Sequence, residues 1–135
     1  MTLVDTNVLI DVLMGDSTWY QWSLDALDQR AADGALLIND VIYAELAVRM
    51  NSVATLREAL AEFNVELVRT PEEALFVAGK MFQRYRAAGG VRTGVLPDFF
   101  IGAHAQFEGW PIVTRDLRRY RTYFPDVELI APGWP

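Results

Sequence analysis

Short apolar runs alternate with longer amphipathic segments along this chain. The apolar runs predict buried strands, and the segments in which apolar positions recur every three or four residues predict helices. Strands are expected at residues 2–5, 35–38, 65–69, 111–114 and 127–131. Helices are expected at residues 7–14, 17–34, 40–50, 52–63, 71–88, 96–109 and, as a short turn, 114–120. This alternation is typical of an α/β fold with a mainly parallel central sheet.

Glycine and small polar residues mark the expected ends of several helices. Gly15 and Gly34 predict the ends of the first two helices, because glycine readily adopts the left-handed conformation that terminates a helix. Ser17 is the expected N-cap of the second helix, and either Asn39 or Asp40 caps the third.

Length and composition favour one soluble domain. The chain has 135 residues, of which 52% are hydrophobic, and neither a linker nor a repeat interrupts it, so residues 1–135 are expected to share one core. The absence of cysteine excludes disulfides, a thiolate zinc site and a cysteine nucleophile. The N-terminal segment has an Asp within its first five residues and no basic region, unlike a signal peptide, and no apolar run reaches the ~18 residues of a membrane span. A cytoplasmic protein without a membrane partner is expected.

The net charge of −6, from 18 acidic and 12 basic residues, argues against binding nucleic acid by bulk attraction to phosphate. The charge is unevenly distributed, however. Residues 80–121 contain eight basic and three acidic residues, a local charge of +5, whereas the remainder carries −11. Eleven of the twelve basic residues are arginine, which suits multi-donor contacts with phosphate or carboxylate. A solvated charged face and a phosphate-binding surface both explain this segment.

Four acidic residues occupy positions where acids are unexpected. Asp5 and Asp116 follow predicted strands, and the carboxyl ends of parallel strands meet at one edge of the sheet, the usual binding crevice of open α/β folds. Asp98 begins an apolar helix after Pro97, and Glu45 lies on the inward stripe of the helix at 40–50. Each also has a local explanation. Asp98 and Asp116 could be helix caps, and either of the two residues after Asp5 could provide the cap there instead. Glu45 could pair with Arg49 one turn later.

Taken together, the four acids indicate a metal site. Carboxylates ~4 Å apart repel by about 4 kcal/mol at an effective dielectric constant near 20, so such a cluster needs a cation. Oxygen ligands favour Mg²⁺ or Mn²⁺, which can activate water and stabilise the leaving oxygen in phosphodiester hydrolysis. The chain has one histidine, no G-x-S-x-G elbow and neither of the common glycine-rich phosphate-binding motifs, so no competing catalytic apparatus is evident.

Four motifs resemble those of the PIN domain, specifically the VapC-type toxin ribonucleases of toxin–antitoxin pairs. They are D-T-N at 5–7, A-E-L at 44–46, P-D-F-F-I-G-A-H-A at 97–105 and T-R-D at 114–116. The resemblance implies a three-layer α/β/α sandwich and a Mg²⁺ or Mn²⁺ site. The implied residues are Asp5, Glu45, Asp98 and Asp116 as metal ligands and catalytic residues, with Asn7 and Thr114 in support. A further acid that some relatives carry after the fourth is absent, because Leu117, Arg118 and Arg119 follow Asp116.

The resemblance also implies an activity and partners. These are endoribonuclease cleavage of an RNA substrate, homodimerisation, and inhibition by a cognate VapB-type antitoxin in a hetero-oligomer. A catalytically inactive PIN-like domain that binds RNA or another partner is the alternative. A receiver domain is disfavoured because the single lysine, Lys80, lies within a helix, and a haloacid-dehalogenase-like phosphatase is disfavoured because Asp5 does not begin a D-x-D motif.

Residues outside the acidic set have more than one interpretation. Arginines near Asp98 and Asp116 are expected to contact RNA phosphates; the candidates are Arg92, Arg115, Arg118 and Arg119. His104 is expected to be a packing or surface residue, and Asp11 an exposed helix residue, although it could border the crevice. Trp19, Tyr20 and Trp22 form either part of the core or an exposed apolar patch.

Overall fold

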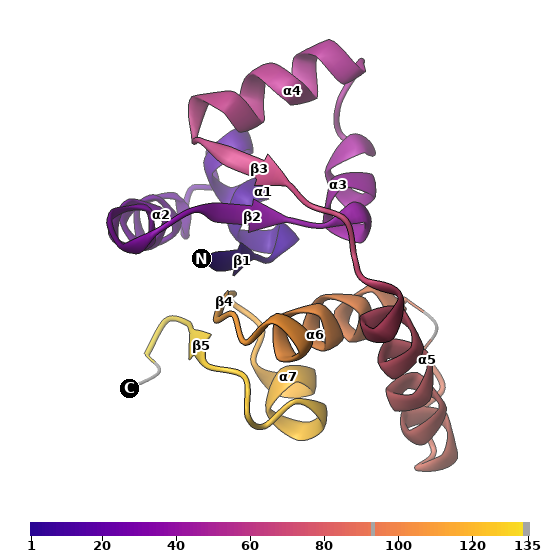
Figure 1. Ribbon diagram of the computed structural model, residues 1–135. Helices are drawn as coiled ribbons and strands as arrows, with labels where there is room; N and C mark the ends of the chain where they lie inside the picture. The colour runs from indigo at the N-terminus through magenta and orange to yellow at the C-terminus, as the bar shows by residue number, and fades with distance from the viewer. Residues whose placement is uncertain (93, 134–135) are drawn as a thin grey trace.

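The computed structural model describes residues 1–92 and 94–133, which contain a five-stranded sheet. All strand pairs are parallel, and the order is β3-β2-β1-β4-β5 (Figure 1). The strands are β1 (Thr2–Val4), β2 (Leu36–Ile38), β3 (Val65–Leu67), β4 (Ile112–Val113) and β5 (Leu129–Ile130). The alternating apolar pattern therefore predicted the parallel sheet correctly.

Helices connect the strands and cover both faces of the sheet, which confirms the three-layer α/β/α architecture. The connections step from β1 to β3 in one direction and from β3 through β4 to β5 in the other. Because crossovers between parallel strands are right-handed, this reversal places the two sets of helices on opposite faces. The helices are α1 (Thr6–Met14), α2 (Tyr20–Asp33), α3 (Asp40–Ala47), α4 (Val53–Glu62), α5 (Glu72–Ala87), α6 (Leu96–Glu108) and α7 (Arg118–Tyr123). None of these described helices has the length and apolar character of a membrane span.

Strand register brings distant parts of the chain to one edge of the sheet. Val4 of β1 pairs with Val113 of β4, and Leu3 pairs with Leu37 of β2. The three central strands are fully buried, since both faces carry helices. The residues that follow β1, β2 and β4 consequently emerge side by side at the carboxyl edge.

The start of α2 differs from the sequence prediction. The helix begins at Tyr20, not at residue 17, because the carboxylate of Asp16 accepts hydrogen bonds from the main-chain N–H groups of Thr18 (3.0 Å) and Trp19 (2.7 Å) and forms a turn there. Ser17 is therefore not the N-cap. In this region Trp22 packs against the core, whereas Tyr20 is exposed.

Gly102 allows a close approach between α6 and α7. A Cβ atom at this position would overlap the aromatic ring of Phe124, which is itself fully buried. Gly79, in the middle of α5, has open space at the corresponding position. Gly102 therefore has no room for a side chain, whereas Gly79 does.

Replacing each glycine by alanine tests this packing. Gly102→Ala is expected to lower the free energy of unfolding by about 1–3 kcal/mol, because the added methyl group overpacks the contact with Phe124. Gly79→Ala is the matched control and is expected to raise the free energy of unfolding by about 0.5–1 kcal/mol, since alanine has the higher helix propensity. Urea denaturation measures both. Equal stabilisation by the two substitutions would contradict the close packing of α6 on α7.

Candidate functional site

Asp5 lies at the centre of the carboxyl edge, where β1 ends and α1 begins. Its side chain caps α1, because Oδ1 accepts a hydrogen bond from the main-chain N–H of Thr6 at 2.7 Å. Its Oδ2 accepts hydrogen bonds from the hydroxyl groups of Thr114 at 2.8 Å and Tyr120 at 2.9 Å. The carboxylate is therefore buried, and residues from β1, the end of β4 and α7 meet on it.

Burial dominates the electrostatics of Asp5. Desolvation raises its pKa to about 6; the hydrogen bonds from Thr114 and Tyr120 act in the opposite direction, and the charge of Asp98 raises the pKa further. Tyr120 is a site residue that sequence reasoning missed. The spacing of Tyr120 from Phe124, one helical turn apart, could have indicated that it faces the core.

Glu45 faces the start of α1. Its Oε1 accepts a hydrogen bond from the hydroxyl group of Thr6 at 2.6 Å, so the local pairing with Arg49 that the sequence left open is not the contact observed. Burial raises the pKa of Glu45, the bond from Thr6 lowers it, and Asp98 raises it. Thr6 was not singled out from the sequence, because a threonine in the first turn of a helix is unremarkable without knowledge of its partner.

Asp98 lies in the first turn of α6 and is paired with an arginine from α7. Nε of Arg119 donates to Oδ2 of Asp98 at 2.8 Å, and both side chains are largely buried. Burial raises the pKa of Asp98; Arg119 lowers it, and Asp116 raises it. Asp98 thus feels the charge of Asp116 and, in turn, raises the pKa of Asp5 and Glu45.

Thr114, Asn7 and Asp116 complete the contacts around Asp5. The hydroxyl oxygen of Thr114 accepts the main-chain N–H of Asp116 at 3.0 Å while the same hydroxyl group donates to Asp5. The amide nitrogen of Asn7 lies 3.4 Å from both Asp5 Oδ2 and the Thr114 hydroxyl oxygen. Asp116 accepts from the main-chain N–H of Arg118 at 3.2 Å. Asn7 and Thr114 therefore connect Asp5 to the loop that carries Asp116.

Two of the four candidate arginines are engaged inside the protein. Arg119 pairs with Asp98, and Arg115 pairs with Asp11, from Nε to Oδ2 at 2.7 Å and from Nη2 to Oδ1 at 3.0 Å. The expectation that Asp11 is exposed is wrong, because this ion pair holds it with only 1% of its surface accessible. Arg92 and Arg118 are exposed, and Arg118 follows Asp116 by two residues.

The four acidic side chains suit a hard divalent cation by their chemistry. All donors are oxygens, burial raises the pKa of three of them, and Asp98 couples them electrostatically. Within residues 1–92 and 94–133, no three Asp, Glu or His side chains are already arranged to hold a metal ion. The positive charge of Arg119 compensates Asp98 in this arrangement.

His104 links the two helices that carry Glu45 and Asp98. Asn39 caps α3 by accepting the main-chain N–H of Ile42 at 3.2 Å, so its amide NH₂ group faces Nδ1 of His104, also at 3.2 Å. Because the Asn39 oxygen accepts from Ile42, we assign Nδ1 as the acceptor of this bond; Nε2 is then the protonated nitrogen, and it is buried without a hydrogen-bond partner among the described residues. His104 is 1% exposed and packs against Trp110, which confirms a packing role. Asn39, not Asp40, is the N-cap.

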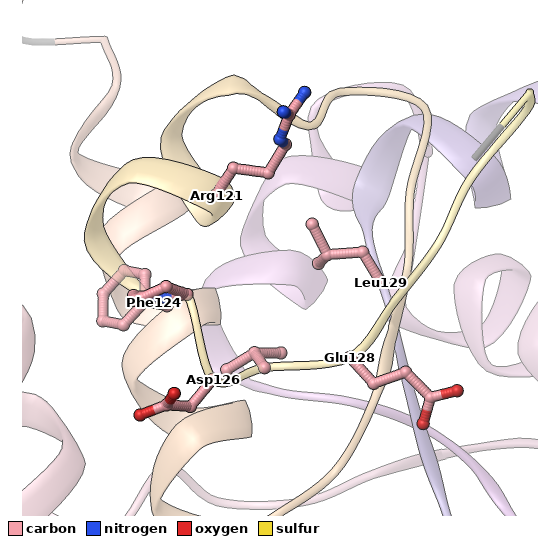
Figure 2. Close-up of a pocket in the computed structure, with 7 residues that line it drawn as sticks. Arg121, Phe124, Asp126, Glu128 and Leu129 are labelled. Atoms are coloured by element: carbon pink, nitrogen blue, oxygen red, sulfur yellow. The ribbon is translucent and has the colours of Figure 1, made fainter. Parts of the chain in front are cut away.

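One surface hollow lies away from these acids. Figure 2 shows it between the end of α7 and the start of β5, with a volume of about 440 Å³ and lining residues that include Arg121, Phe124 and Glu128. None of the predicted site residues lines it.

Fold and site together define a class of protein: an α/β/α domain with clustered carboxylates at the carboxyl edge of a parallel sheet. The sequence matches the PIN domain over residues 2–125, and the chain belongs to this family. The resemblance inferred from the four motifs is confirmed at this level. No curated protein sequence matches the chain significantly.

Solved structures with a similar fold include several toxin–antitoxin complexes. VapBC2 from Rickettsia felis, bound to a promoter DNA fragment, has a TM-score of 0.71 at 18% identity, covering 96% of this chain and 97% of that chain. A toxin–antitoxin complex from Klebsiella pneumoniae has a TM-score of 0.71 at 21% identity, covering 100% of both chains. VapBC-1 from nontypeable Haemophilus influenzae has a TM-score of 0.70 at 18% identity, with 96% of both chains covered. At these identities the likeness establishes the shared fold.

The bond between His104 and Asn39 predicts acid sensitivity. Burial lowers the pKa of His104, although the charges of Glu108 and Asp40 act to raise it. In the unfolded chain the pKa of histidine is about 6.5, so the unfolded state binds the proton more readily than the folded state. The contribution of His104 to stability is therefore present above about pH 6.5 and is lost as the pH falls below it. His104→Asn can still accept from Asn39 but does not titrate. The urea midpoint should therefore decrease more between about pH 8 and about pH 5.5 in the wild type than in the variant. Equal decreases would contradict a neutral His104.

Proposed function

We propose that this protein is a metal-dependent endoribonuclease and the toxin of a VapBC-type toxin–antitoxin pair. The observation that carries the proposal is the environment of Asp5. A carboxylate buried at the junction of β1 and β4 is coupled to Asp98, which is coupled in turn to Glu45 and Asp116. Membership of the PIN family and the toxin–antitoxin complexes among its structural neighbours support the same function.

In the proposed reaction, Asp5, Glu45, Asp98 and Asp116 would hold Mg²⁺ or Mn²⁺. When bound, such a cation would lower the pKa of a water molecule and offset negative charge on the scissile phosphodiester. Thr114 and Tyr120 favour the ionised form of Asp5 by donating hydrogen bonds to Oδ2. Thr6 orients Glu45 through its hydroxyl group. The chain would thus supply oriented anionic ligands, and the exposed Arg92 and Arg118 are the candidates to contact the phosphates of RNA.

The proposal extends to partners. Neighbouring folds were solved as VapBC or toxin–antitoxin complexes, so we infer that a VapB-type antitoxin binds this chain, with a homodimer in the complex and a cytoplasmic location.

One observation favours a second candidate function, a catalytically inactive PIN-like domain that binds RNA. Arg119 already compensates the charge of Asp98, and no ready-made group of three ligands exists in the described part of the chain. In that case the acids would be a structural network.

Metal binding and RNA cleavage distinguish the two functions. Mn²⁺ is expected to raise the melting temperature of the wild type, because a cation that binds only the folded state stabilises it by linkage. Asp5→Asn should remove both this shift and cleavage of single-stranded RNA, a loss of at least about 10²-fold. The matched control is Asp126→Asn, which changes an exposed carboxylate beside the hollow in Figure 2. RNA binding without Mn²⁺ stabilisation or cleavage by the wild type would favour the inactive domain.

Arg118 provides a test of the RNA surface. Its side chain is 82% exposed and forms only a long contact, 3.8 Å, with Asp116. Arg118→Gln is expected to weaken RNA binding uniformly across sequences and to reduce the slope of log affinity against log salt by about 1. Arg57→Gln on α4, at the opposite end of the strand order, is the control and should leave the slope unchanged. An unchanged slope for Arg118→Gln would remove this arginine from the RNA surface.

A further inference from the structure

Residue 115, between Thr114 and Asp116, is held by α1 through both its main chain and its side chain. The main-chain N–H of Arg115 donates to Oδ1 of Asn7 at 3.1 Å. One helical turn further along α1, the carboxylate of Asp11 accepts two hydrogen bonds from the guanidinium group of Arg115. Asn7 and Asp11 are four residues apart and therefore lie on the same face of the helix. The loop that follows β4 is thus attached to α1 at two successive turns.

The ion pair is built as an interior structure. Asp11 is 1% exposed, and its Oδ2 also accepts the hydroxyl group of Ser23 from α2 at 2.6 Å. The guanidinium carbon of Arg115 lies 5.2 Å from the centre of the Trp19 ring, which covers it from the other side. Two parallel hydrogen bonds between a guanidinium group and a carboxylate fix the relative orientation of the two groups as well as their distance. Asp11, Ser23 and Trp19 together leave the Arg115 side chain 27% exposed.

Both neighbours of Arg115 reach the acidic site. Thr114 donates to Asp5, and Asp116 donates its main-chain N–H to the hydroxyl oxygen of Thr114. A shift of residue 115 would therefore move both partners at once. Because reacting groups tolerate little displacement, a loop that is held at its central residue keeps the flanking groups in place.

We propose that Arg115 is a positioning residue, anchored by Asp11, that holds Thr114 and Asp116 in register with Asp5. Its charge compensates a buried carboxylate of α1, and the phosphate-binding role expected from the sequence passes to the exposed arginines. The consequence for catalysis rests on the proposed function, whereas the anchoring of residue 115 does not.

Hydrogen exchange of the amides at residues 115 and 116 tests the anchoring directly. Asp11→Asn keeps the shape of the anchor but removes its charge, so both amides are expected to exchange at least about tenfold faster.

Leu60→Ala, in α4 next to the far edge strand β3, is the control for a general loss of stability. Asp33→Asn removes an exposed ion pair with Arg30 and should leave both amides unchanged. Ser23→Ala, which removes only one bond to Asp11, should act in the same direction as Asp11→Asn and less strongly.

Metal titration and kinetics test the link to the site. In Asp11→Asn, the Mn²⁺ concentration at half-maximal thermal stabilisation should rise about 10–100-fold, as for other residues that orient metal ligands. The value of kcat for RNA cleavage should fall with little change in KM, because substrate contacts remain. Arg115→Lys keeps the charge but loses the fork, so it should lie between the wild type and Asp11→Asn.

The outcomes are distinguishable. If exchange, Mn²⁺ response and kcat in Asp11→Asn change no more than in Leu60→Ala, the ion pair is merely structural and the positioning role is overturned. If Arg115→Gln weakens RNA binding and its salt slope as Arg118→Gln does, with exchange at 116 unchanged, Arg115 acts on RNA and the proposal is equally overturned. If the wild type neither binds Mn²⁺ nor cleaves RNA but Asp11→Asn accelerates exchange, the anchoring holds and the proposed function fails.

Discussion

The parallel pairing of β1 with β4 determines where every other part of the site lies. Leu3 pairs with Ile112 and Val4 with Val113, so two segments more than 100 positions apart in the sequence leave the sheet at the same edge. Asp5 and Thr114 are then neighbours without any further adjustment, and their hydrogen bond closes the junction. The helices that begin at this edge add the remaining groups. The site is thus a consequence of strand register, and its precision depends on the packed core that fixes this register.

Burying Asp5 at this junction has an electrostatic cost that the surroundings offset only in part. Three groups donate short hydrogen bonds to its two oxygens, yet its pKa is still raised, because desolvation is the larger effect. Desolvation is also the larger effect for Asp98. Its pKa is raised because the ion pair with Arg119 does not fully compensate burial and the charge of Asp116. An edge with this imbalance favours an additional positive charge. A bound cation or a protonated carboxyl group would supply it, and PIN-family chemistry uses the first.

Periodicity predicted the fold, and strand-end positions singled out the acidic residues as site candidates, but side-chain partners were predicted poorly. Asp11 illustrates the reason. On α1 alone it is a charged residue one turn beyond Asn7, and only the arrival of Arg115, 104 positions later, makes burial favourable. Glu45 similarly had a local candidate in Arg49 but bonds to Thr6. Local rules describe contacts within one element, whereas these contacts join elements whose proximity follows from the sheet.

Counting charges along the sequence therefore has a specific weakness in this fold. The segment 80–121 carries a local charge of +5, but Arg115 and Arg119 of that segment are oriented toward Asp11 and Asp98. Their charge is neutralised by carboxylates that lie at or beneath the site, so these two arginines contribute little to the attraction of a phosphate backbone. Under the proposed function, the exposed arginines, including Arg92 and Arg118, are the ones left to contact RNA. In that case the acidic centre would repel the substrate unless a divalent cation offset part of its negative charge, which would couple RNA binding to metal binding.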